Sequence, residues 1–263
     1  MATRILHVSD LHFGTREDTA VERAVAALVE QARPELIVAS GDLTHRGRRE
    51  QHERVARFLR GLGPEVLAVP GNHDIPLAVP ARLTRPWAEF ERCWETTEPT
   101  YTSPTLHVVG VNSVRPWHHQ SGGLSGAQLG GAAARLEAGA PGAFRVVALH
   151  HQLTGGPWRS RKKPLARRDQ VLARLVASGA ELIVGGHIHQ VSVSERREFA
   201  VLGDGDRSVV LSIAPGLGQP RPNRLGEARG LHVYVVHDDA FEIETSIWQG
   251  SGWTRTAVRQ FAR

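Results

Sequence analysis

A repeated local pattern between residues 5 and 69 constrains the fold of this chain most strongly. In each repeat a short apolar run, typical of a buried strand, is followed by a polar turn and then by apolar residues at helical spacing. Strands that alternate with helices form an α/β sheet, and such sheets bind ligands beyond the carboxyl ends of their strands. The predicted elements, in chain order, are a strand at 5–8, a helix at 18–32, a strand at 35–39, a helix at 48–60 and a strand at 65–69.

The rest of the chain is less regular and becomes rich in strands toward its end. We find no internal repeat, low-complexity segment or linker, and we therefore expect one domain over residues 1–263, with a second sheet packed on the first. Helices are predicted at 83–94, 125–138 and 169–177. Strands are predicted at 105–111, 143–149, 181–184, 191–194, 208–213, 231–236 and 241–248.

Composition excludes several classes of protein. Hydrophobic residues make up 41% and charged residues 22%, as in ordinary globular proteins. The net charge of +5 is compatible with an anionic partner, but the sequence lacks the contiguous basic stripe that is typical of nucleic-acid binding. No apolar run is long enough for a signal peptide or a membrane span, and the single cysteine, Cys93, cannot form an internal disulfide. We therefore expect a cytoplasmic protein with no membrane partner.

The turn after the third predicted strand reads Gly71-Asn72-His73-Asp74. Taken alone it is ambiguous, since Gly permits positive φ and Asn and Asp bond to their own backbone in ordinary turns. The turn indicates a functional site because comparable polar residues follow the other predicted strands. The five clusters are Asp10 with His12, Asp42, Asn72 with His73, His150, and His187 with His189.

The residue types in these clusters predict a metal centre. In an extended segment residues i and i+2 point to the same side, so Asp10 with His12, and His187 with His189, can each direct two side chains to one point. Carboxylate, imidazole and amide donors without thiolate suit Mn, Fe, Zn, Co or Ni. Seven of these groups, Asp10, His12, Asp42, Asn72, His150, His187 and His189, exceed the needs of one catalytic ion. If Asp42 bridges, the groups divide between two ions about 3.5–4 Å apart, a geometry suited to displacement at the phosphorus of a phosphoester.

Taken in order, the five clusters resemble the sequence blocks of the calcineurin-like metallophosphoesterase superfamily. That resemblance implies a four-layer α/β/β/α sandwich with two mixed β-sheets and two divalent or trivalent metal ions, such as Mn, Fe or Zn. It implies one ion on Asp10, His12, Asp42 and His189, and the other on Asp42, Asn72, His150 and His187. It also implies a hydroxide held by the metals as the nucleophile, attacking phosphorus in line.

Three further roles depend on this resemblance. The resemblance implies that His73 faces the scissile phosphate, where it stabilises charge and can protonate the leaving oxygen, and that Asp42 is catalytic as the bridging ligand. Asp74 is expected to support the turn. Strand alternation leaves His150 and His151 open as alternatives, and the family pattern selects His150. Where many relatives follow the histidine pair with prolines, this chain has Gln152-Leu153, so the rim of the substrate site is expected to differ.

The Ser9-to-Gly14 opening, residues 122–129 and residues 221–230 resemble bacterial cyclic nucleotide phosphodiesterases. A cyclic nucleotide is therefore the favoured phosphodiester, and a small phosphoester the expected partner. A phosphomonoesterase, a DNA exonuclease and a non-catalytic interaction module of this fold are the alternatives, so nucleic acid is a less favoured partner. Lipid-diphosphate hydrolases of the superfamily commonly lack a histidine at the position of His73. The oligomeric state, including a homodimer, is left open.

Two loops carry hypotheses of lower rank. The basic run 159–163 follows a predicted ligand strand and could steer a phosphate, although a solvated loop is the more common role of such a run. His45, Trp117, His118 and His119 are expected to lie on exposed loops rather than to form a substrate cap.

Overall fold

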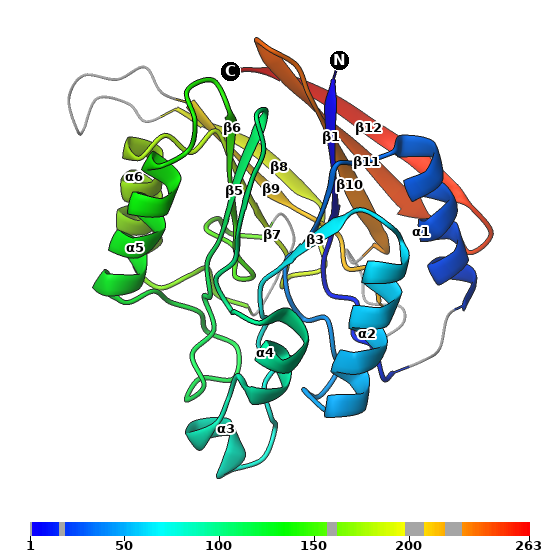
Figure 1. Ribbon diagram of the computed structural model, residues 1–263, viewed down its shortest axis with the longest axis vertical. Coiled ribbons are helices and arrows are strands. Elements are labelled where there is room, and N and C mark those ends of the chain that lie inside the picture. The colour runs from blue at the N-terminus through cyan, green and yellow to red at the C-terminus, as the bar shows by residue number, and fades with distance from the viewer. Residues whose placement is uncertain (1, 16–18, 157–161, 198–207, 219–227) are drawn as a thin grey trace.

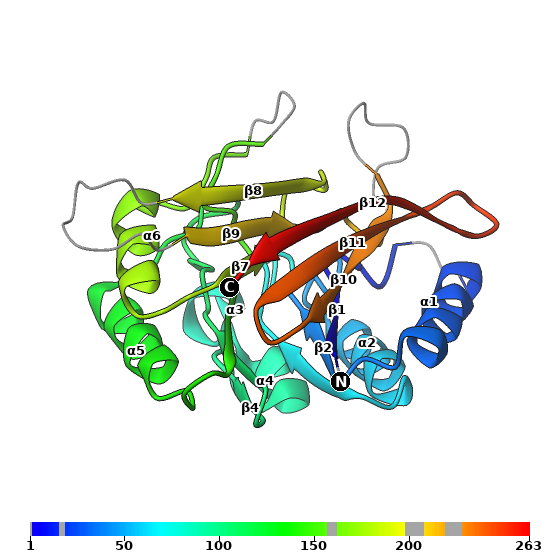
Figure 2. The same cartoon turned by 90° about the horizontal axis from the view of Figure 1, so that it is seen from above.

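The protein is a sandwich of two six-stranded sheets that lie face to face, with helices on the outer face of each sheet (Figures 1 and 2). The structure, a computed structural model, describes residues 2–15, 19–156, 162–197, 208–218 and 228–263. Both sheets are mixed, and the layers follow one another as α/β/β/α. The fold class expected from the sequence is confirmed.

The first sheet joins strands from the two ends of the chain in the order β12-β11-β10-β1-β2-β3. β1, β2 and β3 are parallel, so their carboxyl ends lie at one edge, whereas β10, β11 and β12 are antiparallel to their neighbours. Its strands are β1 (Thr3–Val8), β2 (Leu36–Ala39), β3 (Glu65–Ala68), β10 (Gly230–Val236), β11 (Ala240–Trp248) and β12 (Trp253–Ala262).

The second sheet has the order β4-β5-β6-β7-β9-β8. β5, β6, β7 and β9 are parallel, and β4 and β8 pair antiparallel at the two edges. Its strands are β4 (Thr100–Thr102), β5 (Leu106–Gly110), β6 (Phe144–Ala148), β7 (Leu182–Gly185), β8 (Ser192–Arg197) and β9 (Ser208–Ile213).

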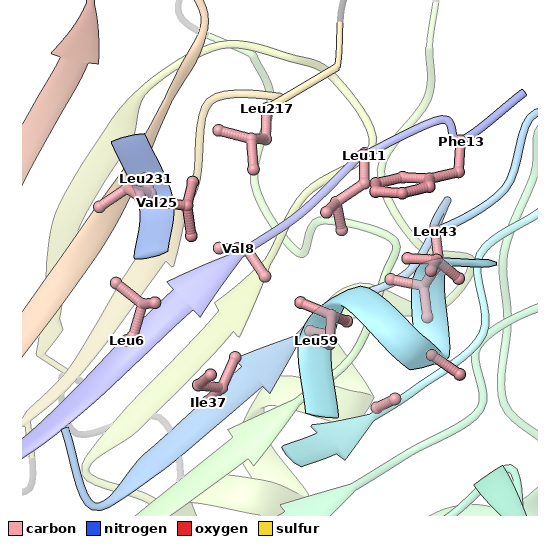
Figure 3. Close-up of a cluster of buried hydrophobic side chains, with 14 of the residues drawn as sticks. Leu6, Val8, Leu11, Phe13, Val25, Ile37, Leu43, Leu59, Leu217 and Leu231 are labelled. Atoms are coloured by element: carbon pink, nitrogen blue, oxygen red, sulfur yellow. The ribbon is translucent and has the colours of Figure 1, made fainter. Parts of the chain in front are cut away.

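Helices cover the outer faces because the strands alternate their buried side chains between the two faces. On β1, Leu6 faces the helices of the first sheet and Ile5 faces the second sheet. Leu6, Ile37 and Leu59 meet in the core between the first sheet and its helices (Figure 3). The helices on this side are α1 (Thr19–Ala32), α2 (Arg49–Gly61) and α4 (Ala88–Trp94), and those on the other side are α5 (Gly126–Glu137) and α6 (Arg168–Ala177).

The predicted helix at 83–94 is wrong in its extent, because the structure has two short helices, α3 (Ala81–Thr84) and α4. Arg85 between them has φ −144° and ψ 57° and precedes Pro86. The residue before a proline is sterically disfavoured in the helical region, which accounts for the break. Cys93 on α4 is buried in the core between the first sheet and its helices, as expected.

Two strands were not predicted, β4 and β12. Among the side chains of β12 only Phe261 is buried, so the strand lacks the alternation of buried and exposed residues by which strands are recognised. The helices that the structure describes include none long and apolar enough to cross a membrane.

Candidate metal centre

The seven predicted ligands come together at the edge where the parallel strands of both sheets end. Asp10 and His12 follow β1, Asp42 follows β2, and Asn72 follows β3. His150 follows β6 in the second sheet, and the remaining pair, His187 and His189, follows β7. All seven side chains are buried.

The route by which these side chains converge differs from the extended geometry predicted from the sequence. Eight non-glycine residues in the described part of the chain have positive φ, and five of them are predicted ligands. The left-handed region is sparsely populated, and residues held there cluster at functional sites. The five are Asp10 (φ 53°), His12 (49°), Asp42 (51°), His187 (73°) and His189 (56°).

Three side chains form a first donor group, composed of Asp10, His12 and His189. His189 Nε2 lies 3.1 Å from Asp10 Oδ1 and 3.2 Å from His12 Nε2. His12 Nε2 lies 3.9 Å from the same carboxylate oxygen. Burial lowers the pKa of His12 to about 3, so its imidazole is neutral near pH 7 and has a lone pair available for a cation.

Three others form a second donor group, composed of Asn72, His150 and His187. His150 Nε2 lies 3.3 Å from Asn72 Oδ1 and 3.1 Å from His187 Nδ1. The other ring nitrogen of His150, Nδ1, donates to the carbonyl of Ser40 at 2.9 Å, which leaves Nε2 without a proton in the neutral ring. This group therefore directs two nitrogens and one amide oxygen to a common point.

Asp42 lies between the two donor groups and is fully buried. Its Oδ2 is 3.9 Å from His12 Nε2 in the first group, and its Oδ1 is 3.4 Å from His150 Nε2 in the second. Burial favours the neutral acid, yet the neighbouring His150 and His73 hold the pKa of Asp42 well below its ordinary value. Burial alone would lower the pKa of His150, but the Asp42 carboxylate outweighs it and raises that pKa to about 9, so a cation would have to displace the Nε2 proton of this ring. The position between the two donor groups thus carries an ionised carboxylate.

Three observations test whether this arrangement fits metal ions. Asp10 Oδ1 and Asp42 Oδ2 are buried and accept no hydrogen bond, which is costly unless a cation compensates. The closest donor pairs are 3.1–3.3 Å apart. Donor atoms bound to one ion at about 2.1 Å and at right angles lie about 3 Å apart. The donor atoms of Asp10, His12 and His189 lie within 4.8 Å of one another, as do those of His150, His151 and His187, and we conclude that the site fits cations.

The turns that carry these residues are packed too closely for larger side chains. Gly71 lies against the turn after β2, where an added Cβ would come within 2.1 Å of the backbone nitrogen of Asp42. Gly41 has φ +91°, and a Cβ there would lie 2.7 Å from His150 Nδ1. Both glycines therefore allow the turns of β2 and β3 to touch.

Asp74 fastens the same two turns together. Its buried carboxylate accepts hydrogen bonds from the backbone nitrogens of Gly71 at 2.8 Å, Leu43 at 3.1 Å and Thr44 at 2.7 Å. The Thr44 hydroxyl donates a fourth bond at 2.9 Å. Asp74 is thus hydrogen-bonded as expected of a support for this turn.

His73 is half-buried beside the first donor group rather than inside it. Its ring stands edge-on to His12 with centroids 4.9 Å apart and is stacked on His45 at 5.8 Å. His73 Nδ1 lies 2.8 Å from the carbonyl of His45, and since a carbonyl can only accept, this nitrogen carries the proton. The expectation that His45 lies on an exposed loop is wrong, because it is half-buried against His73.

The other expectations have mixed outcomes. His151, the alternative to His150 as a ligand, is buried against the rings of His150 and His187, with Nδ1 2.8 Å from the Ser113 hydroxyl. Trp117, His118 and His119 are exposed, as expected.

In the basic run, Lys162 is half-buried and donates to the carbonyl of His187. Arg159 and Arg161 lie outside the described residues, as does most of the segment 221–230.

A sandwich of this kind, with polar side chains gathered where its strands end, is the fold of the metallo-dependent phosphatases. The family model for calcineurin-like phosphoesterases matches residues 3–191, and the chain belongs to that family. A probable cyclic nucleotide phosphodiesterase of Synechococcus sp. is 27% identical over 77% of this chain and 80% of that protein.

Solved structures are similar in fold. A dimetal phosphatase from Danio rerio matches with a TM-score of 0.67 and 14% identity, over 99% of this chain and 98% of that one. The purple acid phosphatase PPD1 of yellow lupin matches with a TM-score of 0.72 and 8% identity, over 100% of this chain and 54% of that one. At these identities the likeness concerns the fold alone.

Proposed function

We propose that this phosphoesterase is a two-metal phosphodiesterase that hydrolyses a small phosphodiester at the shared edge of its two sheets. The observation that carries the proposal is the position of Asp42. One carboxylate oxygen is directed toward the first donor group and the other toward the second, and Oδ2 accepts no hydrogen bond. A carboxylate placed in this way suits two ions that share one ligand.

The proposed ligands divide by donor group, with Asp42 common to both. When bound, the two ions would supply Lewis-acid stabilisation of the phosphate oxygens and would lower the pKa of a water molecule at the site. Oxygen and nitrogen donors without thiolate favour Mn, Fe or Zn. The first ion is assigned to Asp10, His12, Asp42 and His189, and the second to Asp42, Asn72, His150 and His187.

His73 is proposed as the group that faces the phosphate. Since its Nδ1–H donates a hydrogen bond to the carbonyl of His45, Nε2 is the nitrogen left for the substrate. In the imidazolium form Nε2 donates to a phosphate oxygen or passes its proton to the leaving oxygen. The backbone nitrogen of His73 also donates to Asp42 Oδ1 at 2.8 Å, which ties its position to the bridging carboxylate.

A cyclic nucleotide is the substrate that the similarity to the Synechococcus protein favours. A comparison of turnover on 3′,5′-cyclic AMP, 2′,3′-cyclic nucleotides, phosphomonoesters and single-stranded DNA tests this choice. We expect the cyclic phosphodiesters to be hydrolysed fastest. A higher kcat/KM on monoesters would instead make the protein a phosphomonoesterase, and DNA cleavage would make it an exonuclease.

Asp42→Asn provides the decisive test of the two-metal assignment. The change keeps the shape of the side chain but removes its charge, so we expect the protein to bind fewer ions and to lose about 10³-fold or more of its kcat on bis(p-nitrophenyl) phosphate. Metal content after dialysis is measured by elemental analysis, and activity after addition of Mn²⁺. Asp238→Asn, at an exposed carboxylate, is the matched control. Full activity and full metal content in Asp42→Asn would remove the bridging role.

We further propose that residues 1–263 act as one domain. The support is the first sheet, in which β1 pairs directly with β10, so that the beginning and the end of the chain share one layer.

A further inference from the structure

A pocket of about 150 Å³ borders the proposed metal centre. Asn72 and His73 form part of its wall. The rest comes from three segments that supply no proposed ligand, namely residues 45–46, 75–82 and 119–120. The pocket therefore reaches from the group that faces the phosphate to the surface, where the remainder of a substrate would lie.

The charge of this pocket is one-sided. Its described lining contains Arg46 and Arg82, together with the imidazoles of His45, His73 and His119, and it contains neither aspartate nor glutamate. Side chains of this kind donate hydrogen bonds to anions and create a positive potential in a concave site. An anionic group is the chemistry that this lining recognises.

Arg82 strengthens this conclusion because its charge is buried and uncompensated. The side chain is 6% exposed, and the ion pairs of the described residues do not include it. Its guanidinium donates to three main-chain carbonyls, those of Pro116 at 2.7 Å, Pro76 at 3.2 Å and His118 at 3.2 Å. Carbonyls orient the guanidinium without neutralising it, and burial lowers the pKa of Arg82.

The same three hydrogen bonds fix the pocket before a ligand enters. They join the segment before α3 to the loop at 116–118, which leads directly into the lining residues His119 and Gln120. A preformed site loses less conformational entropy on binding than a mobile one. Ile75 and Leu77 add apolar surface to the lining, which suits the carbon skeleton that carries the anionic group.

We propose that this pocket holds the leaving side of the phosphodiester and, among acyclic phosphodiesters, selects leaving groups that carry a negative charge of their own, a carboxylate or a second phosphate. The inference rests on the proposed function. Hydrolysis breaks the bond from phosphorus to the leaving oxygen, forms a bond from phosphorus to the oxygen of water, and gives the leaving oxygen a proton. Because His73, the proposed proton donor, is part of the pocket wall, the leaving side of the substrate occupies the pocket.

Two isosteric substrates separate charge from shape. Methyl 4-carboxyphenyl phosphate and methyl 4-carbamoylphenyl phosphate differ at the leaving group only in a carboxylate against a carboxamide. After each rate is divided by its uncatalysed rate, we expect kcat/KM to favour the carboxylate by at least about fivefold at low salt, the size of a partly exposed charge interaction. The preference should fall as ionic strength rises. Replacing the carboxylate by a phosphate tests the second source of charge.

Arg46→Gln tests the pocket directly. The variant keeps a polar side chain of similar length and should bring the preference close to one, mainly through KM, whereas Arg46→Lys should restore part of it. Arg57→Gln, at an exposed arginine of α2 outside the pocket, removes the same charge from the protein and should leave the preference intact. Equal kcat/KM for both substrates in the native protein, or a preference unchanged in Arg46→Gln, would overturn the proposal.

A binding measurement keeps the test independent of turnover. The two leaving groups, 4-hydroxybenzoate and 4-hydroxybenzamide, are titrated calorimetrically into the native protein and into Arg46→Gln. We expect the native protein to bind the carboxylate more tightly and the variant to lose that difference. If bis(p-nitrophenyl) phosphate is not hydrolysed, the phosphodiesterase assignment fails, while selective binding of the carboxylate would still support the pocket.

Discussion

The proposed metal centre and the adjoining pocket share a wall but are built in opposite ways. The predicted ligands are buried and follow strands of the two sheets directly. In the pocket Arg46, Leu77, His119 and Gln120 are exposed and belong to connecting segments. The centre is thus fixed by the sheets, whereas the pocket is fixed by loops that can vary without disturbing them. Chemistry and substrate choice are therefore separable in this protein.

Among the tests of this comparison the largest expected effect concerns His73, which lines the pocket and packs against His12 of the proposed centre. His73→Gln should lower kcat by about 10²–10⁴-fold, the usual contribution of a positioned proton donor, with metal content unchanged. Activity is measured at saturating Mn²⁺, and bound metal by elemental analysis. If the ions were lost together with the activity, His73 would be a metal ligand and would belong to the metal centre.

A second prediction tests how the turns that carry the proposed metal centre are held together. Asp74→Ala leaves four hydrogen-bond donors without their acceptor and should reduce the free energy of unfolding by about 4 kcal/mol. Urea denaturation measures the change. Asp239→Ala, at an exposed residue, is the control and should remain within about 0.5 kcal/mol of the native protein. An equally small change in Asp74→Ala would show that the turns of β2 and β3 are held by packing alone.

A third prediction concerns the stability of the fold in acid, through the buried His232 on β10. Burial lowers the pKa of His232 to about 4, against 6.5 for an ordinary histidine. Above pH 6.5 both the folded and the unfolded chain are neutral there. Between pH 6.5 and 4 only the unfolded chain takes up the proton, so stability falls through this window, by at most about 3 kcal/mol.

His232→Gln should flatten that pH dependence. The ring contacts the carbonyl of Ile213 and the hydroxyl of Thr245, and glutamine can donate to the first and accept from the second. His237→Gln, at an exposed histidine, should leave the slope as it is. Stability is measured by urea denaturation between pH 4 and 7. An unchanged slope in His232→Gln would assign the acid sensitivity to other buried groups.

The smallest expected effect lies at the basic run beside the second donor group. Lys162→Met should raise KM for anionic substrates by a few-fold at low salt, because a half-buried ammonium near His187 attracts the phosphate. Lys163→Met, at the exposed neighbour, should change KM less. Equal KM values for both variants and the native protein at low salt would show that this run only solvates the loop.

The sequence allowed the residues of the proposed metal centre to be predicted more fully than those of the pocket, for a physical reason. A buried strand followed by Asp42, Asn72 or His150 is a local pattern, and parallel strands bring such ends to one edge. The pocket depends instead on loops that meet only in the folded chain. Nothing local to Arg82 shows that its guanidinium is buried against carbonyls more than thirty residues away. His45 was likewise missed, because its contact with His73 joins two separate turns.

Even within the centre, sequence spacing predicted the meeting of Asp10 with His12 but not its geometry. The pair was expected on an extended backbone, whereas both residues are left-handed. That conformation depends on contacts between turns, among them the backbone hydrogen bonds from Asp10 to Gly41 and from His12 to Asp42. β12 shows the same limit in the fold, because its place is set by pairing with β11 rather than by a buried face.

The left-handed backbone of these turns also decides which substitutions can be interpreted. Alanine in that conformation costs about 1–2 kcal/mol, whereas asparagine and aspartate adopt it more readily. An alanine scan at Asp10, Asp42 or His187 would therefore measure two effects together, the loss of the side chain and the cost of holding alanine in the left-handed conformation. Asparagine replacements keep the turn, and they remove the charge and one oxygen at Asp10 and Asp42 and the imidazole at His187, so they measure the contribution of each side chain more directly.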